Sequence, residues 1–379
     1  MSLSLLTFVC MALDSVKKAP RGVTLSGSTG GEGNKDNLRV KYDTIGGIPV
    51  LLNSILEDNF SVFKDFSGEF KEYHDLVAGR ISTYFNVETW LMACVDVGIN
   101  GRELISGYIP VICGVAGLFQ GSNLVSEPIA GILEGLGLWN QVSRPRLKAS
   151  ILGYHLQFEI GSRVLSLWRP DLLILDGPLV VPSHLKLLGL REDMERLVGS
   201  LTGLLAEARR MEIPVIGFVK RSRSMLLSKK LGLRLRDSAL LSQVLEVGEF
   251  TKPVEISDIA HSRYRAYLKG DVEILDGLYC FYMKSVGGRV YRVEVSGWDH
   301  ANIGGLASLL YHLAEPSTGL PVPLMIVDDY SKVTDKVADS MLLSFISRVL
   351  RAVKDGELAN DVLKLLVLQY GERAVGGVK

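Results

Sequence analysis

Hydrophobic residues in this chain form two patterns, short unbroken apolar runs and longer stretches with helical spacing. The unbroken runs are typical of buried strands, whereas apolar positions three or four residues apart indicate amphipathic helices. Four runs predict strands, in the order LMACVDVG, YIPVICGVAGLF, DLLILDGP and IPVIGFVK. Helical spacing over residues 147–168 and 192–211 separates the last three. Strands that alternate with helices in this way predict an α/β fold built from βαβ units.

The C-terminal half continues this pattern. Strands are predicted over residues 278–284 and 290–295 as an antiparallel pair, followed by a helix over residues 303–312. The run LMIVDD at 324–329 predicts another strand, and two final helices complete the chain. Asn100 and Gly101 are predicted to form the turn between the first two strands.

The N-terminal region has a different character. Residues 17–41 are dense in Gly, Ser and charge, which predicts a mobile loop, and residues 45–86 have the apolar spacing of two amphipathic helices. We therefore expect N-terminal helices over 1–84, an α/β domain over 85–340 and a C-terminal helical tail over 341–379.

Composition limits the function classes. With 379 residues and 47% hydrophobic residues, the chain is long and apolar enough for a well-packed core, which excludes a long disordered protein. Four widely spaced cysteines without a CxxC pair argue against a zinc ribbon or a disulfide framework. The apolar stretch at residues 3–13 is too short to span a bilayer, so we expect a soluble, cytoplasmic protein with no membrane contact.

Carboxylates at the predicted strand ends carry the candidate chemistry. Asp96 ends the first strand and Asp176 ends a later one, and open α/β sheets place their sites at the carboxyl ends of strands. Glu159 lies 17 residues before Asp176 on the preceding helix and is a plausible third ligand. Divalent metals that activate water prefer such hard oxygen ligands. The pattern predicts a metal-dependent phosphodiester hydrolase, although an Asp-Gly at a strand end is also a common turn.

Positive charge gathers in one segment. Lys plus Arg and Asp plus Glu both number 42, so a nucleic-acid surface must come from local clustering. The segment that begins with the last residue of the run IPVIGFVK holds seven basic residues before the first acid: Lys220, Arg221, Arg223, Lys229, Lys230, Arg234 and Arg236. Such runs are often solvated faces, but this one starts beside the predicted carboxylates and can hold phosphates. Lys220 is the candidate for contact with the transition state.

Four motifs together resemble the NurA family of nucleases: VDVGIN at 95–100, FEIGS at 158–162, ILDGPLV at 174–180 and GFVKRSRS at 217–224. The resemblance spans roughly residues 85–340. It implies a ribonuclease-H-like mixed sheet with flanking helices and N- and C-terminal helical additions. It also implies that Asp96, Glu159 and Asp176 bind Mn²⁺, or Mg²⁺, in a homodimer.

The resemblance further implies an activity and a partner. Such a protein degrades single- and double-stranded DNA ends as a 5′–3′ exonuclease, with possible single-strand endonuclease activity. It acts with a HerA-like hexameric ring ATPase in DNA end resection before homologous recombination, typically in archaea. The predicted closing motif at 319–333 departs from the family, because Leu320 and Asp328 stand where a Tyr and a His are usual. Asp328, or Asp329 if the register slips, is then the expected fourth ligand and catalytic residue.

Two other functions remain open. An actin-like or sugar-kinase-like ATPase shares the core and uses an Asp-x-Gly turn, like residues 96–98, to hold phosphate. Its second phosphate loop is missing here, since Pro178 follows Asp176 and Gly177. A catalytically inactive NurA-like binding subunit is the second alternative, given Leu320 and Asp328.

Overall fold

The structure is a computed structural model that describes residues 70–133, 136–182, 190–270, 272–299, 302–352, 360 and 363–366. Apart from Phe70, these residues belong to one compact unit, Lys71–Lys379. The predicted loop at 17–41 and most of the predicted N-terminal helices lie outside the described residues. Within the described ranges, no helix is both long and apolar enough to cross a membrane.

A mixed sheet of eleven strands forms the centre of the described part of this unit, in the order β1-β8-β10-β11-β7-β6-β2-β3-β4. Strands β2, β6 and β7 are parallel to one another, and β5 and β9 pair with β3 and β10 from outside this order. The strands are β1 (Val77–Arg80), β2 (Leu91–Leu104), β3 (Gly107–Gln120), β4 (Asn123–Leu124), β5 (Ile129–Ile132), β6 (Leu172–Asp176), β7 (Val215–Val219), β8 (Glu249–Thr251), β9 (Val254–Glu255), β10 (Tyr279–Lys284) and β11 (Val290–Ser296).

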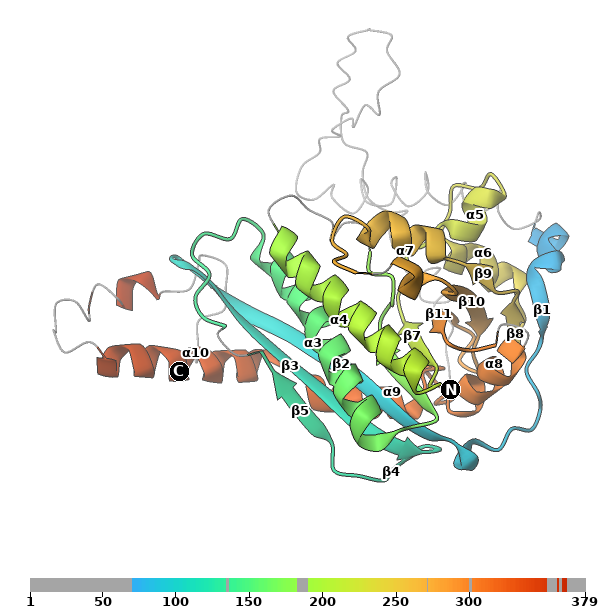
Figure 1. Ribbon diagram of the computed structural model, residues 1–379, viewed down its shortest axis with the longest axis horizontal. Coiled ribbons are helices and arrows are strands. Elements are labelled where there is room, and N and C mark those ends of the chain that lie inside the picture. The colour runs from blue at the N-terminus through green and yellow to red at the C-terminus, as the bar shows by residue number, and fades with distance from the viewer. Residues whose placement is uncertain are drawn as a thin grey trace, which may run out of the picture. The chain divides into compact units, whose positions relative to one another are not determined.

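Helices cover both faces of the sheet (Figure 1). Helices α3 (Pro145–Trp168) and α4 (Arg191–Arg210) lie together on one face, where Gly153 of α3 packs against Ile99 of β2 and Gly114 of β3 packs against Ile160 of α3. Helices α8 (Ile303–His312) and α9 (Val322–Ser331) pack on the other face and share an apolar core with β2, β6, β7, β10 and β11. The remaining helices are α5 (Leu226–Lys230), α6 (Asp237–Val244), α7 (Ser257–Tyr264) and α10 (Asp335–Ala352), with 3-10 helices at Phe70–Leu76, Val87–Thr89 and Val272–Leu275.

Strand alternation decides toward which face of the sheet Asp96 and Asp176 point. Met92 and Cys94 of β2 belong to the core beneath α8 and α9. Because successive side chains of a strand point to opposite faces, Asp96 points to this same face. The same rule places Asp176 there, after Leu172 and Ile174 of β6.

Most of the predicted elements are present, but two are wrong. The run at 324–329 folds as helix α9, with Leu324, Val327 and Ser331 buried three and four residues apart. A short apolar run fits a buried strand as well as a helix, and Pro323 in the first helical turn needs no N–H partner. Asn100 and Gly101 do not form a turn, since both lie inside β2 and the hairpin turn comes at residues 105–106.

The predicted boundaries also differ from the observed elements. Residues 70–80, predicted as helix, form a 3-10 helix and strand β1. The proposed boundary at 340 falls inside α10, which begins at Asp335. The predicted helices over residues 147–168, 192–211 and 303–312 are confirmed as α3, α4 and α8.

Candidate metal centre

Three aspartates from different elements converge at one point. Each of Asp96, Asp176 and Asp328 offers a carboxylate oxygen, and the three oxygens lie within 4.8 Å of one another. Asp96 lies inside β2, which continues to Leu104, so the prediction that it ends this strand is wrong. Asp176 ends β6, and Asp328 lies on α9, which crosses the same face. Asp329, the alternative ligand in the sequence, is exposed and lies outside this cluster. Because residues 322–331 form a helix, Asp328 and not Asp329 belongs to the cluster.

Lys220 lies between two of these carboxylates. It follows the last residue of β7, the strand next to β6, and its Nζ lies 2.6 Å from Asp176 Oδ2 and 2.8 Å from Asp328 Oδ1. The side chain is about four-fifths buried. Two short charge-assisted contacts in a partly buried place fix the ammonium group within the cluster.

The pKa of Asp176 is raised to about 7, first by burial and then by the charge of Asp96. The charge of Lys220 opposes this rise. Burial lowers the pKa of Lys220, but the Asp176 and Asp328 carboxylates outweigh burial, so the net pKa is raised and Lys220 stays cationic. A carboxyl group with a pKa near neutrality among like charges is typical of a functional site.

The position of α9 depends on close contacts with β2. Ser331 Oγ donates a hydrogen bond to Asp96 Oδ2 at 2.6 Å and is also 3.1 Å from the Asp328 carbonyl. A Cβ on Gly98 would lie 2.0 Å from the Ser331 carbonyl oxygen. The glycine of the Asp-x-Gly sequence is therefore required for the approach of α9, and this contact accounts for it without a phosphate loop.

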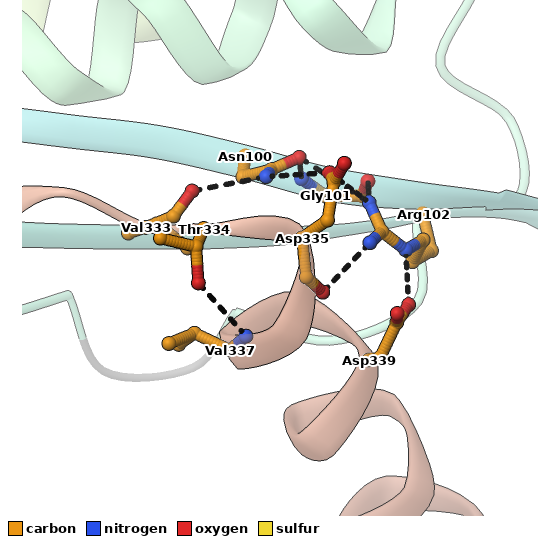
Figure 2. Close-up of polar contacts among 8 residues, drawn as sticks. All are labelled: Asn100, Gly101, Arg102, Val333, Thr334, Asp335, Val337 and Asp339. Atoms are coloured by element: carbon orange, nitrogen blue, oxygen red, sulfur yellow. Dashed lines mark hydrogen bonds and ion pairs between the residues drawn. The ribbon is translucent and has the colours of Figure 1, made fainter. Parts of the chain in front are cut away.

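Further residues on the same face of β2 contact the α9–α10 connection and the first turns of α10 (Figure 2). Asn100 Nδ2 donates to the Val333 carbonyl at 3.0 Å. Arg102, which is buried, donates to Asp339 at 2.6 Å and to the Asp335 backbone carbonyl at 2.8 Å. These contacts hold the α9–α10 connection against the strand that carries Asp96.

Glu159 is not brought into the aspartate cluster. It lies on α3, which packs on the opposite face of the sheet from α9, and its side chain is 56% exposed beside His155. The prediction relied on a helix passing over the strand ends, but the helical register turns this side chain toward solvent. Gln157, two residues earlier on α3, reaches the backbones of β2 and β6 beside Asp96 and Asp176.

Sequence reasoning missed Gln157 and Ser331. Gln157 is 2% exposed and donates from Nε2 to the Val95 and Asp176 carbonyls. A buried polar residue within an apolar helical face was the available signal for Gln157, since buried amides need partners. Ser331 gave no comparable signal. Leu320 packs against the apolar core beneath α9.

The basic segment is exposed next to the cluster. Apart from Lys220, none of its basic side chains pairs with a carboxylate in the part of the chain that the structure describes. Asp237 anchors the segment from beneath by accepting hydrogen bonds from Leu226 N at 2.7 Å and Ser228 N at 2.9 Å. Burial raises the pKa of Asp237, but these and other donors hold it below its ordinary value. The exposed basic residues are Arg221, Arg223, Lys229, Lys230, Arg234 and Arg236.

The donor set fits a hard divalent cation. Three carboxylate oxygens of like charge are held together in a partly buried place, and burial together with the charge of Asp96 raises the pKa of Asp176. Oxygen-only ligation suits Mg²⁺ and Mn²⁺ better than softer ions. No cysteine is part of this cluster, and the described thiols Cys94, Cys113 and Cys280 are free.

The chain is similar to known proteins both in sequence and in fold. A family model described as the NurA domain matches residues 138–333. The chain is similar to the crystal structure of the NurA nuclease from Sulfolobus solfataricus, at 15% identity and a TM-score of 0.62, over 82% of this chain and 99% of that one. It is also similar to a crystal structure of NurA with manganese, at 11% identity and a TM-score of 0.50, again over 82% and 99%. These likenesses confirm the predicted ribonuclease-H-like mixed sheet with flanking helices. No curated protein matches the chain.

Proposed function

This chain belongs to the NurA family, and on that premise we propose that it hydrolyses phosphodiester bonds of DNA at the cluster of Asp96, Asp176 and Asp328. Family membership makes the chain a nuclease, which is a hydrolase that acts on DNA. The observation that carries the proposal is the convergence of three carboxylates and Lys220, which come from β2, the ends of β6 and β7, and helix α9.

Asp96, Asp176 and Asp328 are the residues that would hold the cation. A solved NurA structure contains manganese, which supports Mn²⁺ as the ion, with Mg²⁺ as an alternative of the same ligand preference. When bound, such an ion supplies Lewis-acid chemistry and a water of lowered pKa. Ser331 keeps the Asp96 carboxylate oriented toward the cluster by its 2.6 Å hydrogen bond.

Lys220 has the role of a phosphate contact. Its ammonium group is cationic, about four-fifths buried, and already lies among the carboxylates. A fixed positive charge at this place can stabilise the negative charge that develops on the phosphoryl oxygens in the transition state. The exposed residues Arg221, Arg223, Lys229 and Lys230 would hold neighbouring phosphates of the backbone.

Several finer properties are proposed from the family resemblance. They are 5′–3′ exonuclease polarity, possible single-strand endonuclease activity and action with a HerA-like hexameric ring ATPase in end resection. A homodimer and archaeal origin are proposed on the same ground. Apolar side chains exposed on α10, including Val337, Met341 and Leu343, support self-association because an isolated surface helix does not need them. We also propose that residues 85–340 are the nuclease domain.

Departures at three positions favour the catalytically inactive alternative. The family His and Tyr are replaced by Asp328 and Leu320, and Glu159 is directed away from the cluster. The ATPase alternative loses support because Gly98 is explained by the approach of Ser331.

The experiment that separates these functions is a DNA degradation assay with purified protein, with and without Mn²⁺. Degradation that requires Mn²⁺ and is lost in Asp176→Ala supports the nuclease. Metal binding without cleavage of any DNA form would favour the inactive subunit. Tight ATP binding without cleavage would favour the ATPase.

A further inference from the structure

We propose that Gln157 is a positioning residue for the metal centre, because its amide group bridges the backbones of β2 and β6 beside Asp96 and Asp176. The inference rests on the proposed function, since it concerns how the carboxylates are set for a cation. Gln157 acts through the backbone, as its hydrogen bonds go to the carbonyl oxygens of Val95 and Asp176.

Strands β2 and β6 separate at this point. Their parallel pairing runs from Met92 and Leu172 to Val95 and Leu175 and then ends. Asp176 remains paired with Phe218 of β7, so β6 stays with β7 and leaves β2. Such a separation interrupts the ladder between β2 and β6, and buried backbone carbonyls then need other donors.

Gln157 Nε2 donates hydrogen bonds to one backbone carbonyl of β2 and one of β6. It lies 3.1 Å from the Val95 carbonyl oxygen and 2.9 Å from the Asp176 carbonyl oxygen. A side-chain amide nitrogen carries two hydrogens, so one can go to each carbonyl. Gln157 is only 2% exposed, which shields both bonds from competition with water. The amide group therefore links β2 and β6 where their backbone pairing has ended.

This link sets the geometry of the carboxylates. Asp96 directly follows Val95, and Asp176 itself carries the second carbonyl. Two carboxylates of like charge repel each other, and this repulsion tends to widen the separation between the strand ends. The Gln157 bridge opposes widening from the α3 face, while Asp96 and Asp176 present their oxygens on the α9 face. Loss of the bridge should therefore change the spacing of the ligands without removing one.

Two substitutions test the proposal. Gln157→Leu keeps a buried side chain of similar size but removes both donors. Gln157→Glu keeps the shape but places an acceptor oxygen where the amide nitrogen was, and as an ionised carboxylate it cannot donate to either carbonyl. Residues that orient metal ligands typically change metal affinity by about 10–100-fold, so we expect each variant to weaken Mn²⁺ binding by this factor. The Glu variant also keeps the test usable if the Leu variant does not fold.

The matched control is Ser200→Ala. Ser200 is a buried hydroxyl on α4 whose hydrogen bonds go to His155 and to the Leu197 carbonyl, away from β2 and β6. Mn²⁺ affinity measured by electron paramagnetic resonance, together with the thermal midpoint, separates positioning from general destabilisation. The control should lower the thermal midpoint and leave Mn²⁺ affinity unchanged.

The outcomes are distinguishable. If the wild type binds Mn²⁺ and both Gln157 variants bind it equally well, the positioning role is overturned while the proposed function stands. If the wild type binds no Mn²⁺, the proposed function and this inference are both overturned. Saturating Mn²⁺ should restore most of the DNA cleavage in Gln157→Leu but not in Asp176→Ala, because only the latter lacks a ligand.

Discussion

Lys220 Nζ lies 2.6 Å from Asp176 Oδ2 and thereby joins the ends of two neighbouring parallel strands, β6 and β7. The same ammonium group contacts Asp328 on α9 at 2.8 Å. When all groups are ionised, three carboxylates and one ammonium leave a formal charge of −2, which one divalent cation neutralises. This balance makes both metal binding and its pH dependence testable.

Replacing Asp96 or Asp176 with alanine should remove Mn²⁺-dependent cleavage while the fold remains. Each residue supplies an oxygen to the cluster, and removal of a group that stabilises transition-state charge typically costs on the order of 10²- to 10³-fold in rate. Single-turnover cleavage rates and circular dichroism of the two variants check this. A wild-type rate in either variant would remove that residue from the site.

Mn²⁺ affinity should rise with pH up to about pH 7. The pKa of Asp176 is raised to about 7 by burial and by Asp96, and only the ionised carboxylate binds the metal well. Affinity should therefore increase up to about tenfold per pH unit below pH 7 and level off above it. Titration calorimetry between pH 5 and pH 8, with proton release measured in two buffers, tests this. An affinity independent of pH in this range would contradict it.

The stability of the metal-free protein should show the opposite pH trend. The folded-state pKa of Asp176 lies above its ordinary value of 3.8, so its contribution to the free energy of unfolding is full below about pH 4. That contribution is lost as pH rises through about 7 and amounts to at most about 4 kcal/mol. Urea unfolding of the wild type and of Asp176→Asn checks this, because the variant should show a flatter profile between pH 5 and pH 8.

Asp328→Asn should weaken Mn²⁺ binding by about one to two orders of magnitude, because the substitution removes an anionic ligand. Asp328→His should retain part of the affinity, since a neutral imidazole also donates a lone pair to manganese. Asp329→Asn is the matched control, because Asp329 is adjacent but exposed and outside the cluster. Equal titrations for the two Asn variants would show that α9 contributes no ligand.

Neutralising Arg221, Arg223, Lys229 and Lys230 together should weaken binding to every DNA sequence and flatten its salt dependence. Each lost phosphate contact lowers the slope of log affinity against log salt by about 0.9 on duplex DNA. The four substitutions together should therefore lower this slope by at most about 3.6. Fluorescence anisotropy over a salt series measures it. The control neutralises four basic residues of α4, namely Arg191, Arg196, Arg209 and Arg210. An unchanged slope in the first variant would identify the segment as a solvated face.

Arg102→Met should loosen the attachment of α10 to β2. The substitution removes charge-assisted hydrogen bonds to Asp335 and Asp339, and such bonds contribute about 1–3 kcal/mol. Arg351→Met, on the exposed side of the same helix, should change the free energy of unfolding by less than about 0.5 kcal/mol. Chemical denaturation of both variants measures their free energies of unfolding. Equal stability of the two would show that the contacts in Figure 2 do not hold the helix.

The sequence by itself determined the parts of the site that depend on local pattern. Unbroken apolar runs separated by helical stretches predicted β2, β6 and β7, and Asp96, Asp176 and Lys220 followed because each stands at or just after the end of such a run. Carboxyl ends of neighbouring parallel strands meet at one edge of a sheet, so the meeting of Asp176 and Lys220 required no knowledge of distant contacts. Asp96 joins them from inside β2, which continues to Leu104.

Only the tertiary structure decided what completes the site. The run at 324–329 is short enough to fit either a strand or a helix, and packing against the core beneath β2 settles it as α9, which brings Asp328 into the cluster. The helical register of α3 turns Glu159 outward and Gln157 inward, a choice made by which face packs on the sheet. Ser331 meets Asp96 across 235 residues of sequence. Such contacts depend on how elements pack against one another, and the spacing of residues along the chain does not contain that information.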